Sequence, residues 1–496
     1  MRTRHSRNFS LLALAAAMAM TTVDAATAPP AATAQAGASQ AAAAEQTKGA
    51  VKKYTLETGI VNGKMVFIDD RGQANPLLRA NVGDTVEIRL KSGEGAQHDI
   101  AIPELKVQSQ KFDAASGPTT VRFTVTQAGK FTYYCTIAGH RQIGMEGVFE
   151  VAGTSIASAP KAAVKTTGVP GAELYTAPAA RPADAAAVSV AMDPAAVPAP
   201  IGARAPQHLK YRIETVELTG KLDDGTSFTY WTFDRKVPGP MLRARIGDTI
   251  ELTLANARDS KMIHSIDLHA VTGGHGGGEH TQVGPGQEKT ITFKALNAGL
   301  YVYHCATPLV PQHISAGMYG MILVEPEGGL PKVDREYYVM QGDMYTTRPH
   351  GAKTHQEFDL DKLAAELPDY YVFNGAVGSL TKEHKLTANV GDTVRIFFGV
   401  GGPNKISSFH VIGEIFDKVY SEGSISSPKR DVQTTLVAPG GATIVELKVD
   451  YPGSYLLVDH ALSRAGKGLV GMLEVSGPAD AGIYKAHTPG KAAATH

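Results

Sequence analysis

The sequence predicts an all-β fold made of three β-sandwich units, and two observations support this prediction. First, runs rich in Val, Thr and Tyr alternate with turn residues along a chain that holds 52 glycines and 28 prolines. Second, one turn-and-strand motif occurs three times, as "LLRANVGDTVEIRL", "MLRARIGDTIELTL" and "KLTANVGDTVRIFF" at 77–90, 241–254 and 385–398. The 496 residues are enough for three domains of ordinary size.

Each copy of the motif predicts a turn that leads into an alternating strand, and the same features follow it. A histidine comes next, and these histidines are His98, His264 and His410. Two strands close each repeat, the first beginning "GKFTYY", "GLYVYH" or "GSYLLV" and the second containing "GMEGVFEV", "GMYGMILV" or "GLVGMLEV". The three units are therefore expected at 51–152, 206–327 and 328–480.

The segments outside the repeats differ in composition. Residues 1–25 combine a basic start, a short apolar run and small residues at the end, which predicts a cleaved secretory signal and a periplasmic protein. Residues 26–50 are rich in Ala and Gln and are expected to be disordered. Residues 153–205, rich in Ala and Pro, predict a semi-rigid linker, while the tail at 481–496 has no clear pattern. No later apolar run is long enough to predict a membrane span.

The charge balance and the cysteine content limit the classes of function that the sequence allows. Lys plus Arg number 48 and Asp plus Glu number 48, so no basic surface points to nucleic acid as a partner. The only cysteines are Cys135 and Cys305. In an exported protein, two cysteines often form one disulfide. Here they occupy matching positions of separate repeats, each with its own His and Met, which favours two ligand sites instead.

Two sets of side chains have the composition of a metal site. The first Cys–His set consists of His98, Cys135, His140 and Met145. The second Cys–His set consists of His264, Cys305, His313 and Met318. Two imidazoles, one thiolate and a weak thioether suit a blue (type 1) copper that transfers electrons. Zinc is the main metal rival, and the lone Met argues against it.

The second repeat carries a further group on its other face. Neighbouring residues of a strand point to opposite faces, so His304 points away if Cys305 points toward the second Cys–His set. His264 and His269 are an odd number of positions apart and face opposite ways, while Asp267 shares the face of His269. We name Asp267, His269 and His304 the outer set. The alternative interpretation is that they are solvated edge residues.

The third repeat has lost the features of a blue site. Asp459 stands at the position of the cysteine and Leu469 at that of the methionine, with no histidine between them except His460. The repeat nevertheless keeps His410 as well as His460, directly after Asp459. These two histidines either have no special role or serve as ligands in a neighbouring site.

Four stretches together resemble the copper-containing nitrite reductases: "IHSIDLHAVTGGHGGG", "YVYHCATPLVPQHISAGMYG", "SSFHVIG" and "LLVDHAL". The resemblance covers 206–480 nearly throughout. The preceding unit resembles a fused cupredoxin with one copper, an arrangement known in a subgroup of that family. The resemblance implies three cupredoxin-like Greek-key β-sandwich domains, of which the last two form the nitrite-reductase core, and it implies a homotrimer.

The resemblance also implies three coppers per chain, two of type 1 and one of type 2. An electron would pass from the type 1 copper of the second Cys–His set through the Cys305–His304 dipeptide to the type 2 copper. The type 2 copper would be held by His269 and His304 together with His460 of the partner subunit, with its open position taken by water or nitrite.

By the same resemblance, Asp267 and His410 handle protons, and Ile412 crowds the bound ligand. The implied reaction takes nitrite, one electron and two protons to nitric oxide and water. A c-type cytochrome, a small cupredoxin or the fused first unit would supply the electron.

This chain departs from the family pattern in two places. The loop from Cys305 to His313 is one residue shorter than in many members, and Gln312 precedes the ligand where some members have a bulky residue, which leaves donor docking open. His275 and His280 stand in a loop that is normally rich in glycine, and we interpret them as surface residues.

Two other functions compete with this interpretation. A multicopper oxidase needs several His-x-His pairs and a His-Cys-His motif, and the sequence contains neither. A non-catalytic copper carrier or electron-transfer protein accounts for the first repeat, but it leaves the outer set and His460 unexplained.

Overall fold

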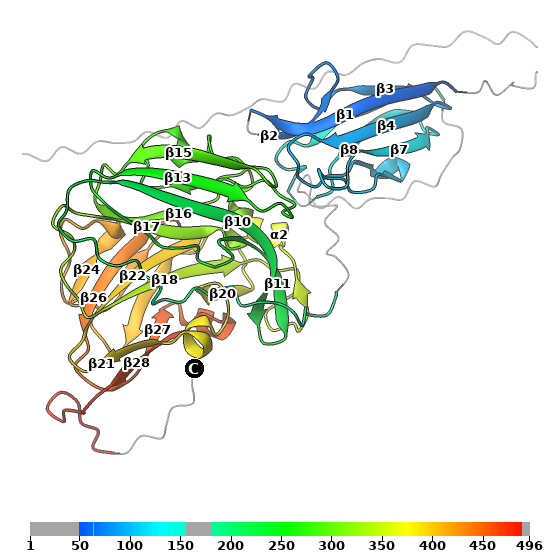
Figure 1. Ribbon diagram of the computed structural model, residues 1–496. Helices are drawn as coiled ribbons and strands as arrows, with labels where there is room; N and C mark the ends of the chain where they lie inside the picture. Colours follow the sequence, from blue (N-terminus) through cyan, green and yellow to red (C-terminus); the bar gives the residue numbers. More distant parts are fainter. Residues whose placement is uncertain (1–48, 63, 138, 155–179, 489–496) are drawn as a thin grey trace, which may run out of the picture. The chain divides into compact units, whose positions relative to one another are not determined.

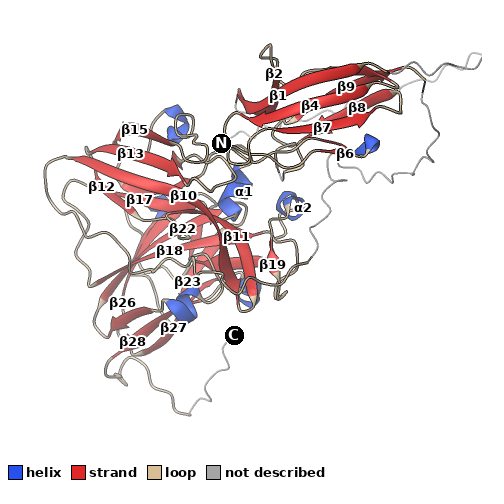
Figure 2. Ribbon diagram, turned by 45° about the vertical axis from the view of Figure 1, so that its right-hand side comes forward, coloured by secondary structure: helices blue, strands red, loops and turns tan. Residues whose placement is uncertain are grey.

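Six β-sheets make up the described part of the protein (Figure 1). A computed structural model describes residues 49–62, 64–137, 139–154 and 180–488. Helices in these ranges are few and short (Figure 2). The prediction of an all-β fold is confirmed.

The predicted signal peptide at 1–25 lies outside the described residues, as do nearly all of 26–50 and the end of the tail at 481–496. None of the helices in the described ranges has both the length and the apolar character that crossing a bilayer requires.

The first two sheets use residues 51–152 and carry the first Cys–His set. Their strand orders are β2-β1-β4-β7 and β3-β9-β8-β5-β6. The strands are β1 (Val51–Val61), β2 (Lys64–Asp69), β3 (Leu78–Asn81), β4 (Thr85–Ser92), β5 (Ala101–Ile102), β6 (Val107–Gln108), β7 (Thr119–Thr124), β8 (Gly129–Tyr134) and β9 (Glu146–Ala152). Leu56 and Ile88 of the first sheet share a hydrophobic cluster with Phe149 of the second, so the two sheets enclose one core.

The third and fourth sheets carry the second Cys–His set and the outer set. Their strand orders are β15-β13-β10-β11-β19 and β12-β17-β16-β14. The strands are β10 (His208–Asp223), β11 (Thr226–Phe233), β12 (Leu242–Arg245), β13 (Thr249–Asn256), β14 (Asp267–Leu268), β15 (Glu288–Lys294), β16 (Gly299–His304), β17 (Tyr319–Glu325) and β19 (His355–Gln356). The short helix α1 (Val310–Ser315) lies between β16 and β17 in the chain and contains His313.

The fifth and sixth sheets belong to the third repeat, and the sixth positions His410 and His460. Their strand orders are β20-β18-β22-β26-β24 and β21-β28-β27-β23-β25. The strands are β18 (Arg335–Met344), β20 (Tyr370–Phe373), β21 (Leu386–Asn389), β22 (Thr393–Gly402), β23 (Ser407–Ile412), β24 (Lys418–Tyr420), β25 (Thr435–Val437), β26 (Ala442–Lys448), β27 (Gly453–Asp459) and β28 (Gly471–Ser476). The helix α2 (Leu360–Ala364) and the 3-10 helix η6 (Leu462–Lys467) occur in the connections.

The repeated Gly-Asp-Thr motif closes the same turn in all three repeats. Its glycines have φ values of +94°, +89° and +97°, at Gly83, Gly247 and Gly391. Such a backbone conformation favours glycine over any residue with a Cβ. In each motif the aspartate accepts a hydrogen bond from the backbone N–H three residues earlier, at 2.9, 2.8 and 2.9 Å for Asp84, Asp248 and Asp392. The motif is therefore a structural element of the fold.

The second and third predicted units share a core. One hydrophobic cluster contains Tyr303 of β16 as well as Tyr338 of β18, and the Tyr338 hydroxyl donates a hydrogen bond to the Gly239 carbonyl at 3.0 Å. Two buried arginines, Arg243 and Arg395, each pair with Glu336 at 2.7 Å. Because both the core and this ion-pair network cross the predicted boundary, the division between these two units stays a proposal.

The predicted linker at 153–205 is described from residue 180 onward, and there it lies on the core. Val190 and Ala191 have no exposed surface, and Ala191 forms a β-bridge with Val237. The Ala and Pro content of this segment conceals the short apolar run "AVSVAM", whose burial is favourable wherever a neighbouring sheet offers an apolar face.

A buried carboxyl in β18 makes the stability of the core depend on pH. The Asp343 side chain is 1% exposed, accepts a hydrogen bond from the Tyr345 hydroxyl at 2.5 Å, and leaves its Oδ1 atom without a partner among the described residues. Burial raises the pKa of Asp343 from 3.8 to about 6. The folded state therefore holds this proton more tightly than the unfolded chain, and its stability falls as the pH rises from about 4 to about 6.

We expect Asp343→Asn to stabilise the protein at neutral pH. The substitution removes a charge whose burial costs up to about 3 kcal/mol above pH 6, because each unit of pKa shift is worth about 1.4 kcal/mol. The thermal midpoint of the variant should exceed that of the wild type at pH 7.5, and the difference should shrink by pH 5. A difference that is the same at both values would show that ionisation of Asp343 is not its cause.

Candidate metal centres

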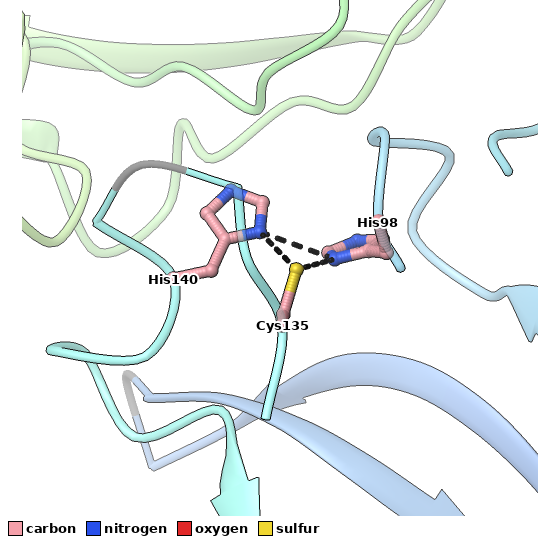
Figure 3. Close-up of side chains that lie close together, drawn as sticks. All are labelled: His98, Cys135 and His140. Carbon is pink, nitrogen blue, oxygen red and sulfur yellow. Dashed lines mark hydrogen bonds between the residues drawn. The ribbon is translucent and has the colours of Figure 1, made fainter. Parts of the chain in front are cut away.

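In the first Cys–His set, Cys135 and His140 follow β8 in the chain and His98 precedes β5. Figure 3 shows these three side chains close together. The Nδ1 atoms of His98 and His140 are 3.2 Å apart, and the Sγ atom of Cys135 lies 3.9 Å from the first and 3.5 Å from the second. These three side chains and Met145 are buried. Two imidazole nitrogens and one sulfur thus converge on a single point, which fits a copper ion.

The second Cys–His set has the same arrangement at the end of β16. The Nδ1 atoms of His264 and His313 are 3.3 Å apart, and Cys305 Sγ lies 3.3 Å from His313 Nδ1. Met318 has no exposed surface. Trp231 packs on the His313 ring with a centroid distance of 4.6 Å and helps to hold that ring in place.

The same backbone hydrogen bonds organise both sets. The N–H of the cysteine donates to the carbonyl of the methionine, at 3.2 Å in the first set and 3.1 Å in the second. The methionine N–H donates to the carbonyl of the second histidine, at 3.0 and 3.1 Å. These bonds fix the loop that carries the cysteine, one histidine and the methionine, although the second loop is longer by three residues.

A partly buried glutamate stands behind the first histidine of each set. His98 Nε2 bonds to Glu94, and His264 Nε2 lies 3.2 Å from Glu217 Oε1. Burial by itself would raise the pKa of each glutamate carboxyl. The hydrogen bond and charge interaction with the histidine are stronger, so the pKa of each carboxyl lies below its ordinary value. Such partners orient the ring and leave its other nitrogen, Nδ1, free to bind a metal. Neither glutamate was predicted.

The two thiols differ in their surroundings. Burial by itself would raise the pKa of the Cys305 thiol. The interactions with His313 and His264 are stronger and hold this pKa well below its ordinary value. Burial raises the pKa of Cys135, and the nearby Asp99 carboxylate adds to the rise. A bound metal cation deprotonates a coordinating thiol in either setting.

The outer set lies where β14 pairs with β16. Asp267 stands opposite His304 in this pairing, and the Nε2 atoms of His269 and His304 are 3.1 Å apart. The Nδ1–H of His304 donates to the Cys305 carbonyl at 3.0 Å, and His269 bonds to the backbone of Gly440. Burial and the nearby His304 lower the pKa of His269, which favours the neutral form that binds metals. The two Nε2 atoms therefore face one shared point.

A glycine-rich loop covers the carboxylate of the outer set. Gly276 has a φ of +64°, and a Cβ on it would lie 1.7 Å from Asp267 Oδ1, so only glycine fits. His275 is exposed and lies 3.5 Å from Glu279. His280 is exposed as well. Both loop histidines thus lie at the surface.

His410 and His460 lie close together at the sixth sheet, the first on β23 and the second directly after β27. The rings of His410 and His460 are 5.6 Å apart, centre to centre, and the His410 ring bonds to the Gln433 carbonyl at 2.6 Å. His460 is exposed, and Ile412 is 40% exposed. Among the described residues, the side-chain groups able to hold a metal are the two Cys–His sets and the outer set, and His460 belongs to none of them.

Comparisons with known proteins identify the family. A family model described as multicopper oxidase matches residues 215–329. The copper-containing nitrite reductase of Neisseria gonorrhoeae is 54% identical over 282 residues, which are 57% of this chain and 72% of that protein. The chain belongs to the copper-containing nitrite reductases.

Other members of this family support the assignment. The copper-containing nitrite reductase of Alcaligenes xylosoxydans xylosoxydans is 37% identical over 53% of this chain and 85% of its own length. The solved copper nitrite reductase of Nitrosomonas europaea is 34% identical and has a TM-score of 0.50, over 55% of this chain and 95% of that one. As a member, this copper-containing nitrite reductase is a copper-dependent oxidoreductase.

Proposed function

We propose that this protein reduces nitrite to nitric oxide and water, using one electron and two protons. The observation that carries the proposal is the outer set, where two imidazole Nε2 atoms lie 3.1 Å apart one residue away from a buried thiol. An electron-transfer protein needs only a Cys–His set. A second cluster of ligands on the opposite face of the same strand suits an enzyme that takes electrons one at a time.

The electron path in this proposal is the Cys305–His304 dipeptide. Cys305 belongs to the second Cys–His set and His304 to the outer set, so one peptide bond joins the two sites. The hydrogen bond from His304 Nδ1 to the Cys305 carbonyl adds a second connection and fixes the ring. Copper bound in the two sites would supply the one-electron chemistry.

The third ligand in this proposal is His460 of the partner subunit. Within one chain, His460 is exposed beside His410 and lies outside the groups of side chains able to hold a metal. A cyclic homotrimer would use one heterologous contact three times and bring each His460 to a neighbour's outer set. The exposed apolar side chains Ile406, Ile412 and Leu462, between 40% and 49% exposed, suit such a contact.

Asp267 and His410 are the proton-handling groups of the proposal. Asp267 is half-buried beside His304 and under the Gly276 backbone, where it can orient a bound ligand and exchange its proton. His410 lies beside His460 and would enter the shared site with it. Ile412, on the same strand as His410, would limit the size of the ligand.

The first Cys–His set would hold a second type 1 copper in its own domain. We propose that the chain has the domains given above, a periplasmic location after removal of residues 1–25, and a c-type cytochrome or a small cupredoxin as electron donor.

Anaerobic turnover tests this function directly. With a reduced donor, the purified protein should convert nitrite to nitric oxide, and fully loaded protein should contain three coppers per chain, two blue and one colourless. Elemental analysis checks the count. Blue protein that transfers electrons but leaves nitrite unchanged would support the carrier alternative.

Asp267→Asn should lower kcat while both blue absorption bands stay. The substitution keeps the size of the side chain but removes a group that donates and accepts protons, and such groups contribute roughly 10²- to 10⁴-fold to rates. The control is Glu279→Gln, which neutralises an exposed carboxylate on the covering loop. Equal rates for Asp267→Asn and wild type across pH 5 to 8 would remove Asp267 from the mechanism.

A further inference from the structure

The third repeat replaces every member of a Cys–His set in register. Asp459, Arg464 and Leu469 follow one another at intervals of five residues, as do the cysteine, second histidine and methionine of the first Cys–His set. The Leu469 N–H donates to the Arg464 carbonyl at 3.2 Å, the same bond that the methionines make to the histidines. Arg464 therefore stands at the place of the second histidine.

The cysteine and first-histidine positions can be matched in the same way. In the second repeat, the Ser265 N–H donates to Cys305 Sγ at 3.4 Å. In the third, the Ser408 N–H donates to Asp459 Oδ1 at 3.1 Å. Asp459 thus takes the place of the thiol, and Ser407, directly before Ser408, takes that of the first histidine. The expectation that His410 matches the first histidine is therefore wrong, because His410 lies three residues after Ser407, as Asp267 does after His264. We name Ser407, Asp459, Arg464 and Leu469 the remnant set.

An ion pair joins Asp459 and Arg464, two members of the remnant set, at the place where a metal would connect a Cys–His set. The Asp459 side chain is 1% exposed and pairs with the Arg464 guanidinium, which is 15% exposed. Arg464 also donates to the Ile406 carbonyl at 2.6 Å and lies over the Tyr371 ring at 4.8 Å. The pair therefore ties the end of β27 to the start of β23 and to β20.

The Asp459 carboxylate of this ion pair also binds the backbone beside His460. Asp459 Oδ1 accepts the N–H of Ser408 and, at 3.0 Å, that of Ala461, while Gln341 donates to Oδ2 at 3.2 Å. The His460 N–H donates to the Ser408 carbonyl at 2.8 Å. His460 is therefore an exposed side chain on a backbone held from within the sheet.

We propose that the Asp459–Arg464 ion pair is a positioning device that holds His460 for the outer set of a neighbouring subunit. This inference rests on the proposed function, because it takes His460 to be the third type 2 ligand. A ligand presented to another chain has to be held in place by its own subunit before the metal arrives. In this repeat, the partly buried ion pair performs that task in place of the copper.

The test measures copper affinity at the type 2 site in intact trimers. Asp459→Asn and Arg464→Gln should each weaken that affinity by roughly 10- to 100-fold, as changes behind a metal ligand do, and should alter the type 2 electron paramagnetic resonance signal. Both blue bands should persist, which also shows that the variants fold. Arg464→Lys, which keeps the charge, should recover part of the loss seen in Arg464→Gln.

Ser407→Ala is the matched control. Ser407 belongs to the remnant set, has no exposed surface, and its hydroxyl has no hydrogen-bond partner among the described residues. It should bind type 2 copper as the wild type does. Wild-type affinity in Asp459→Asn and Arg464→Gln, beside loss of the copper in His460→Ala, would overturn the positioning role and leave the function standing. Retention of the copper in His460→Ala would instead refute the ligand assignment itself.

Discussion

Cys305→Ala should reduce nitrite turnover to the background rate and remove one of the two blue bands. Cys135→Ala should remove the other blue band, and its turnover with a small-molecule reductant should stay close to the wild-type rate. The reason is the position of each thiol. Cys305 lies in one peptide with His304, whose Nε2 faces His269 at 3.1 Å. Cys135 belongs to a separate pair of sheets. In the described part of these sheets, no second group of metal-binding side chains accompanies the Cys–His set.

The two substitutions control for each other, because each removes one buried thiol from an equivalent loop. Absorption spectra report which blue centre is lost, and anaerobic nitric oxide release reports turnover. Copper analysis should show that Cys305→Ala keeps its type 2 copper, since the imidazoles of the outer set remain. If Cys135→Ala were as inactive as Cys305→Ala with the small-molecule reductant, the first unit would be an obligatory relay, and the path proposed here would be incomplete.

Local patterns made much of the fold and the outer set predictable. The Gly-Asp-Thr motif fixes its turn through contacts three residues apart, so its repetition predicted three related units, and the structure shows the same turn in all three places. Strand alternation predicted that His304 and Cys305 serve opposite faces, and the structure brings His304 to His269 and Cys305 to His313. In both cases the deciding geometry lies within a few residues of the motif.

Contacts between distant residues were not predictable in this way. Glu217 lies 47 residues before His264 in the chain and meets it only because β10 passes beside that ring. Arg464 stands five residues after Asp459, at the position of the second histidine. The spacing alone did not indicate a role, because a lone arginine in a loop is usually solvated. Its role depends on the burial of Asp459, which a sequence without a fold does not reveal. The buried run in the linker was likewise hidden by the composition around it.

His460→Ala should abolish nitrite reduction and remove the colourless copper while both blue bands remain. Within one chain, His460 lies on the sixth sheet beside His410, and the outer set lies on the fourth. If the type 2 site is shared, His460 and His269 act in different subunits. Two inactive variants, His460→Ala and His269→Ala, should therefore complement each other when they form mixed trimers.

The complementation has an expected size. The two variants are unfolded, mixed in equal amounts and reassembled with copper. Each interface then takes His460 from one subunit and His269 from the next, and each of these residues is intact with a probability of about one half. About a quarter of the interfaces should then pair an intact His460 with an intact His269, giving about a quarter of the wild-type activity in a cyclic trimer. Two different affinity tags, one on each parent and used in succession, isolate the mixed trimers, in which about one interface in three should be active, and each parent reassembled alone is the control. Mixed trimers without activity would falsify the shared site, because His460 would then serve its own subunit or no site at all.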